Sequence, residues 1–172
     1  RDLSEIHGMV IGTYRERPDA TIVLTSQVEP GFTRSLNLPI FCMAETLRIK
    51  DAMHRAVYPE QFIIGKSSMD DELPKVLLEY MEAHAWARVN QMLYEEAEFA
   101  KIAINMFLAA QVDCTNRLAK AAANVGANWA SITKALECDK RIGLEAYLSP
   151  GRWQESKHLL RDSYTLEAIL AR

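Results

Sequence analysis

Lys101 and Asn105 are two residues whose types and spacing could do chemistry. They lie in the stretch 93–125, which contains no Gly or Pro and is rich in Ala, Leu, Glu and Lys, so a long helix is predicted there. Residues four positions apart on a helix share one face. An ammonium and an amide on that face could polarise a hydroxyl or hold a water molecule, although such a pair is also common on solvated helix surfaces.

His158 and Asp162 have the same spacing in a helix predicted near 156–170. An imidazole one turn from a carboxylate could act as an oriented base, or the two could form a simple surface ion pair. Further upstream, Arg141 lies near a predicted helix end, where an arginine often serves only as a capping charge.

Two stretches of the sequence resemble the sugar-oxidising centre of the UDP-glucose/GDP-mannose dehydrogenases in their order and spacing. They are EFAKIAIN (98–105) and RIGLEAYLSPGRWQESKHLLRD (141–162). The resemblance implies NAD-dependent oxidation of the C6 alcohol of a nucleotide sugar. It assigns Lys101 to the catalytic lysine that stabilises the substrate oxygen, and Asn105 to the residue that positions the sugar or a water. The resemblance also implies that Glu98, the glutamate of this motif, faces the sugar pocket together with Lys101 and Asn105. The Lys-x-x-x-Asn spacing also occurs in β-hydroxyacid dehydrogenases, so a simple alcohol dehydrogenase of that type is an alternative.

The family's PGFAFGGSCLPKD corresponds here to PGRWQESKHLLRD, in which Asp162 matches and His158 replaces the nucleophilic cysteine. The family oxidises its substrate twice, and the cysteine thiolate captures the intermediate aldehyde. Because an imidazole is a poor acyl carrier, we expect a full-length protein to stop at the aldehyde or to form the acid slowly. The resemblance also implies that Tyr147 and Arg141 bind substrate, Arg141 by reaching into the neighbouring subunit.

The segment AETLRIKDAMHRAVYPEQFIIG (44–65) resembles the family's PEFLREG motif and the segment that follows it. Glu45 falls on the first motif glutamate, which is credited with acid/base or water-orienting work. Leu47 and Arg48 fall on its substrate-facing stretch. The second glutamate and the glycine are replaced by Ile49 and Lys50.

The segment LTSQVEPGFTR (24–34) resembles the family's KSTVPPGTTR, where a threonine approaches the nicotinamide. Gln27 takes that place and is the candidate cofactor-binding residue. A plain strand followed by a Pro-Gly turn would explain the same residues without a ligand.

The elements around these motifs indicate an α/β fold followed by an α-helical part. A helical pattern over 2–17 precedes short β-rich runs at 20–26, 39–44 and 62–65, which predicts a partial Rossmann-like layer with a parallel sheet. A helix start near 69–74, a short strand near 88–92 and a helix from Asn128 to Leu136 are also expected. We assign 1–66 to the dinucleotide-binding part and 67–172 to a mainly helical central domain.

Composition narrows the class of protein. The net charge is −3 and no basic block occurs, so nucleic-acid binding is not expected. No apolar run approaches the ~20 residues that span a bilayer, and no signal peptide is recognisable, which favours the cytoplasm. The three cysteines lack metal-site spacing, so we expect no metal site and three reduced core thiols.

The resemblance favours a partial chain, because none of the seven glycines forms the GxGxxG turn that holds the pyrophosphate of NAD. We therefore expect no measurable NAD binding by this piece alone. The apolar residues of 93–125 are spread almost all round the helix, which predicts a homodimer through it. A degenerate homologue that serves as a dimeric scaffold or binds sugar nucleotides is the non-enzyme alternative.

Overall fold

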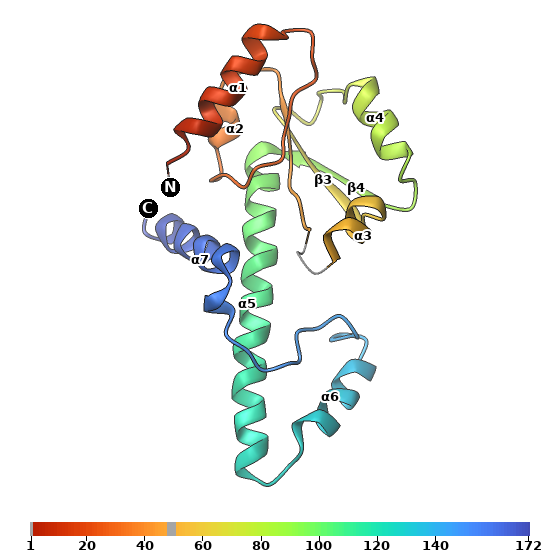
Figure 1. Ribbon diagram of the computed structural model, residues 1–172, viewed down its shortest axis with the longest axis vertical. Coiled ribbons are helices and arrows are strands. Elements are labelled where there is room, and N and C mark those ends of the chain that lie inside the picture. Colours follow the sequence, from red (N-terminus) through yellow and green to blue (C-terminus); the bar gives the residue numbers. More distant parts are fainter. Residues whose placement is uncertain (1, 48–50) are drawn as a thin grey trace. The chain divides into compact units, whose positions relative to one another are not determined.

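The computed structural model describes residues 2–47 and 51–172 (Figure 1). Its helices and strands are, in chain order, α1 (Ser4–Glu16), β1 (Val23–Leu24), α2 (Phe32–Ser35), β2 (Phe41–Met43), α3 (Ala52–Val57), β3 (Gln61–Lys66), α4 (Lys75–Glu82), β4 (Arg88–Leu93), α5 (Tyr94–Asn124), α6 (Trp129–Cys138), the 3-10 turn η2 (Trp153–Glu155) and α7 (Lys157–Leu170). The candidate residue Arg48, with the replacements Ile49 and Lys50, lies outside the described residues. Within the described ranges, no helix is both long enough and apolar enough to cross a membrane.

The four strands form one sheet in the order β1-β2-β3-β4. The pairs β1–β2 and β3–β4 are parallel, as predicted, but β2 and β3 run antiparallel with Cys42 opposite Gly65. The predicted parallel sheet is therefore confirmed at two of these three strand pairs, and it is corrected at the β2–β3 pair. A short apolar strand buries its side chains equally well in either direction, so the sequence pattern does not encode the direction.

The chain divides into two compact units, Arg1–Lys101 and Ile102–Arg172. We predict a domain boundary after Lys66, and β4, which comes later in the chain, pairs with β3 along its whole length. The assignment of 1–66 and 67–172 as domains stays a prediction. We describe the two units separately.

The core of the first unit lies between the sheet and α4. Its buried residues are Met43, Phe62, Ile64, Leu73, Leu77 and Met81. At Gly65 of β3 there is no room for a side chain, because a Cβ atom would lie 2.3 Å from Cys42 Sγ and 2.9 Å from Ala97 Cβ. This glycine lets the first turns of α5 pack directly on the strand.

Helix α5 ends as the sequence predicts. Gly126 has a left-handed φ of 72°, and its N–H donates to the Ala123 carbonyl while the Ala127 N–H donates to Ala122. These two bonds form a Schellman motif, which satisfies carbonyls that the helix leaves unpaired. Asn128 and Ser156 cap α6 and α7 with their side chains.

The apolar residues of α5 are only partly buried within the described chain. In the second unit, Ala109 and Val112 are buried, whereas Phe107 is 73% exposed and Leu118 is 47% exposed. Within the chain that the structure describes, this part of the helix thus has a buried side and an exposed apolar side.

The cysteines are all free, but only Cys42 is buried. The prediction of three core thiols is wrong for Cys114 and Cys138, which lie at exposed positions of α5 and α6. Their helices are amphipathic, and spacing alone does not reveal which side a thiol occupies.

Candidate functional site

The first unit places two candidate residues beyond strand ends. Gln27 follows β1 and Glu45 follows β2, and because these strands are parallel their carboxyl ends lie at one edge of the sheet. Ligands of open α/β sheets bind outside this edge. Both side chains are half-buried, and Gln27 Nε2 donates to the Val28 carbonyl at 3.4 Å.

A small cavity of about 80 Å³ adjoins Glu45 and Leu47. On its polar side Arg55 binds Glu60 at 2.8 Å and Asp51 at 3.3 Å. Since one water occupies roughly 30 Å³ in the liquid, the cavity has room for a few waters but not for a nucleotide sugar. Glu45 lines this cavity, and the role that the resemblance gives it stays a prediction.

Glu98, near the start of α5, is buried and holds backbone rather than facing a pocket. Its Oε2 accepts from the Gly31 N–H at 2.6 Å and its Oε1 accepts from the Thr33 N–H at 2.8 Å. Burial raises the pKa of this carboxyl, and the backbone donors oppose that shift. The expectation that the motif glutamate opens into the sugar pocket is corrected accordingly, because both of its oxygens bind the turn after β1.

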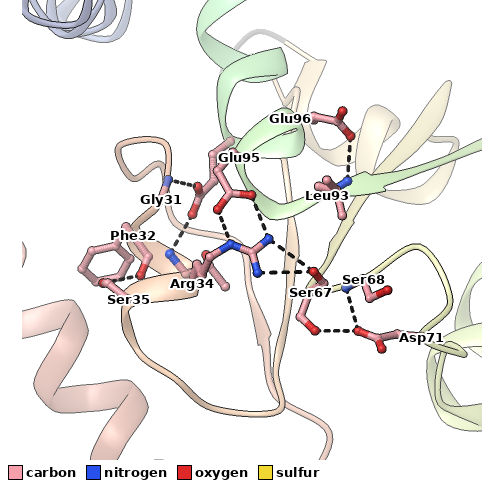
Figure 2. A network of polar contacts seen from close by, with 12 residues as sticks. Gly31, Phe32, Arg34, Ser35, Ser67, Ser68, Asp71, Leu93, Glu95 and Glu96 are labelled. Atoms are coloured by element: carbon pink, nitrogen blue, oxygen red, sulfur yellow. Dashed lines mark hydrogen bonds and ion pairs between the residues drawn. The ribbon is translucent and has the colours of Figure 1, made fainter. Parts of the chain in front are cut away.

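Beside this turn, Arg34 forms a network that the sequence did not reveal (Figure 2). Its guanidinium contacts the Glu95 carboxylate through Nε and, at 3.0 Å, through Nη2, and it donates to the Ser67 carbonyl at 3.2 Å. The hydrogen bond from Arg34 lowers the pKa of Glu95. Asp71 then accepts from Ser67 Oγ at 2.7 Å. Glu95 and Ser67 lie 61 and 33 residues from Arg34 in the sequence, so no local pattern would have found these two contacts.

Lys101 is half-buried and is the last residue of the first unit. Asn105, one turn later on α5, belongs to the second unit and is only 7% exposed. The helix itself fixes the spacing of the two residues, as predicted.

In the second unit the structure brings Asn105 and Asp162 together across 57 residues of sequence. Asn105 Nδ2 donates to Asp162 Oδ2 at 2.6 Å, and Arg161 Nε donates to Asp162 Oδ1 at 2.7 Å. Asp162 is 1% exposed. A carboxylate buried this deeply is stabilised by the amide and the guanidinium that bind its two oxygens.

His158 lies on α7 one turn before Asp162 and is exposed. In the described part of the chain, the hydrogen bonds of the Asp162 carboxylate go to Asn105 and Arg161 instead of to this imidazole. The proposed His158–Asp162 pair is therefore not formed, because the carboxylate already has buried partners.

Arg141 and Tyr147 precede this helix. Arg141 is exposed and binds Asp139, with Nη2 at 2.7 Å from Oδ2. Tyr147 is half-buried; its N–H donates to Gln111 Oε1 at 3.0 Å and its carbonyl accepts from Thr115 Oγ1 at 2.7 Å. The backbone of Tyr147 is thus fixed on α5, whereas Arg141 is held by a local ion pair.

The mixed sheet and the long helix are shared with solved nucleotide-sugar dehydrogenases. The fold is that of the nucleotide-sugar dehydrogenases: a crystal structure of GDP-mannose dehydrogenase from Pseudomonas aeruginosa superposes with a TM-score of 0.67 at 22% identity, covering 96% of this chain and 44% of the other. A UDP-glucose dehydrogenase from Pyrobaculum islandicum gives a TM-score of 0.62 at 22% identity, covering 86% and 40%.

Residues 95–170 match the model of the UDP-glucose/GDP-mannose dehydrogenase family, central domain. A UDP-glucose 6-dehydrogenase from Rickettsia bellii is 25% identical over 163 residues, which cover 88% of this chain and 37% of the relative. One from Streptococcus pneumoniae is 24% identical, covering 97% and 45%. Residues 95–170 are thus similar to the central domain of this family, and the chain spans less than half the length of these relatives.

Proposed function

We propose that the protein containing this chain is a NAD-dependent dehydrogenase, located in the cytoplasm, that oxidises the C6 alcohol of a nucleotide sugar. The observation that carries the proposal is the buried Asn105–Asp162 hydrogen bond of 2.6 Å, one helical turn from Lys101, in the part of the chain that matches the family. Burying an amide and a carboxylate together is unfavourable unless they are well paired, and such pairs are common where a site must be held rigid.

The pair determines how Asn105 can act. Because its Nδ2 donates to Asp162, the orientation of the amide is set, and Oδ1 is the atom that can accept from a sugar hydroxyl or a water. Arg161 balances the charge of Asp162. The ammonium of Lys101 stabilises the negative charge that develops on the substrate oxygen.

The resemblance also gives roles to residues at the strand ends of the first unit. Glu45 orients a water or accepts the proton that leaves the alcohol, and Leu47 and Arg48 contact the substrate. The half-buried amide of Gln27 fits the nicotinamide end of the cofactor, because an amide can both donate and accept. NAD, when bound, is the two-electron oxidant. Tyr147 and Arg141 bind the sugar nucleotide, Arg141 by exchanging its Asp139 partner for a substrate in a second subunit.

His158 limits the second oxidation. Without a thiolate to capture the aldehyde, we expect the aldehyde to accumulate and the acid to form slowly. The test is incubation of the full-length protein with NAD and several nucleotide sugars, followed by mass spectrometry of the products. His158→Cys is the matched variant, and it should shift the product towards the acid. Rapid formation of the uronic acid by the unmodified protein, with two NADH per sugar, would contradict the proposal.

The second candidate function is a dimeric scaffold without turnover, which the presence of His158 in place of the nucleophilic cysteine favours. Phe107 and Leu118 leave an apolar side of α5 exposed, and family relatives that lost their nucleophile could retain only association. Both candidates include a homodimer through 93–125. Sedimentation of the full-length protein at micromolar concentration tests the homodimer, and a monomer would refute it. Absence of turnover by both the unmodified protein and His158→Cys would favour the scaffold.

A further inference from the structure

Four side chains of α5 hold one loop of the second unit, residues 147–153, by hydrogen bonds. Gln111 and Thr115 bind the backbone of Tyr147, as described above. Asn116 binds Gly151 at two points: its Nδ2 donates to the Gly151 carbonyl at 2.7 Å, and its Oδ1 accepts from the Gly151 N–H at 2.9 Å.

The fourth contact closes the loop at its far end. Asp113 Oδ1 accepts from the indole N–H of Trp153 at 2.8 Å. The other hydrogen bonds named here, from Gln111, Thr115 and Asn116, go to the backbone of the loop.

Asn116 and Asn105 lie on one face of α5. They are eleven residues apart, which is close to three full turns, so their directions differ by only about 20° and their positions by about 16 Å along the axis. Ala109 and Val112, between them on the same face, are buried. The same face therefore binds residue 151 through one asparagine and residue 162 through the other.

We propose that Asn116 is a positioning residue: its two-point clamp on Gly151 holds the segment 147–162 on α5 and thereby places His158 and Tyr147 for the nucleotide sugar. This inference rests on the proposed function. Loss of the Asn116 clamp loosens the loop around Gly151, while the contacts of Tyr147 and Trp153 and the Asn105–Asp162 hydrogen bond remain.

The test is Asn116→Asp in the full-length protein. The substitution preserves the size of the side chain and the acceptor for the Gly151 N–H, but it replaces the donor with a carboxylate oxygen that faces the Gly151 carbonyl. Arg117→Ala is the control, because Arg117 is the exposed neighbour on the same helix. Two measurements are made: hydrogen exchange of peptides covering 147–153, and KM and kcat for a nucleotide sugar with NAD.

We expect exchange in 147–153 to become about tenfold faster in Asn116→Asp, and KM to rise at least about fivefold, with peptides of α6 and the control variant unchanged. Unchanged exchange in 147–153 would overturn the clamp. Faster exchange with KM and kcat both unchanged would overturn the positioning role. If the unmodified protein turns over no nucleotide sugar, the proposed function fails, and the exchange measurement still decides whether Asn116 holds the loop.

Discussion

Among the residues that the structure describes, each of the two units contains one buried carboxylate, and these carboxylates have different kinds of partner. Glu98 in the first unit accepts from two backbone N–H groups of the turn after β1. Asp162 in the second unit accepts from the side chains of Asn105 and Arg161. A carboxylate that binds backbone fixes the path of the chain, whereas one that binds side chains fixes the direction of functional groups.

The motif on α5 therefore combines two roles at nearby positions: Glu98 fixes the path of the chain, and Asn105, held by Asp162, has a fixed direction. Glu98, Lys101 and Asn105 follow one another on α5, but Glu98 is turned towards the 31–33 turn. Substitutions at Glu98 should therefore affect folding, and those at Asp162 should affect turnover.

The largest expected effect is that of Glu98→Gln on stability. The amide keeps one acceptor and turns a donor towards the second backbone N–H, so a buried donor loses its partner. We expect the free energy of unfolding to fall by about 3 kcal/mol, measured by urea denaturation. Glu95→Gln is the control: its partner Arg34 is exposed, and the loss should stay below about 1 kcal/mol. Equal losses of unfolding free energy in the two variants would show that the backbone contacts of Glu98 stabilise the fold no more than the exposed ion pair of Glu95 does.

Asp162→Asn should act mainly on the reaction. The new amide presents a donor to Arg161 or to Asn105, so the orientation of Asn105 is no longer set. Under the proposed function, we expect kcat to fall about a hundredfold, while the melting temperature falls less than in Glu98→Gln. If kcat changes less than twofold and only stability is lost, the two carboxylates have the same structural role.

Gly65→Ala tests the packing beneath the first turns of α5. The added Cβ would lie 2.9 Å from Ala97 Cβ and 3.1 Å from Tyr94 Cα, so the helix must shift away from β3. We expect a loss of about 2 kcal/mol. Gly12→Ala in α1 is the matched control, because nothing lies within 4 Å of its Cβ and alanine favours the helix, so it should stabilise by up to about 1 kcal/mol.

A smaller effect concerns pH. The pKa of Glu98 is raised by burial, so its contribution to stability is present below the ordinary glutamate pKa and is lost as pH rises through the raised value. The pKa of Glu95 is lowered by Arg34, so its contribution is present above the ordinary value and is lost as pH falls. The stability loss in Glu98→Gln should thus shrink with rising pH while that in Glu95→Gln grows, as measured by denaturation between about pH 4 and pH 7. Slopes of the same sign would contradict this assignment.

The last prediction concerns the reactivity of the three cysteine thiols in the native protein and involves no substitution. Burial raises the pKa of Cys42 to about 12, whereas Cys114 and Cys138 are exposed. Because the thiolate is the reactive form, an alkylating reagent at pH 8 should label the two exposed thiols rapidly and Cys42 only after unfolding. Peptide mapping by mass spectrometry checks this, and rapid labelling of Cys42 in the native protein would show that the packing around Gly65 is open.

Local chemistry in the sequence was sufficient for most elements. The Gly-free and Pro-free stretch predicted α5 within one residue at each end, because helix propensity and the Gly126 cap act over neighbouring residues. The spacing of Lys101 and Asn105 follows from helix geometry alone. The order of strand and helix indicated the α/β class, and motif order indicated the family.

Only the tertiary structure decided the direction of β3 against β2, the two buried carboxylates and the loop clamp. Glu98 finds Thr33 across 65 residues, Asp162 finds Asn105 across 57, and Asn116 finds Gly151 across 35. These pairings form because the tertiary fold brings together segments that are far apart in the sequence. Side-chain type and local periodicity carry no information about which distant segments become neighbours. Desolvation then selects among the available polar groups, because a buried donor or acceptor must find a partner within hydrogen-bond reach.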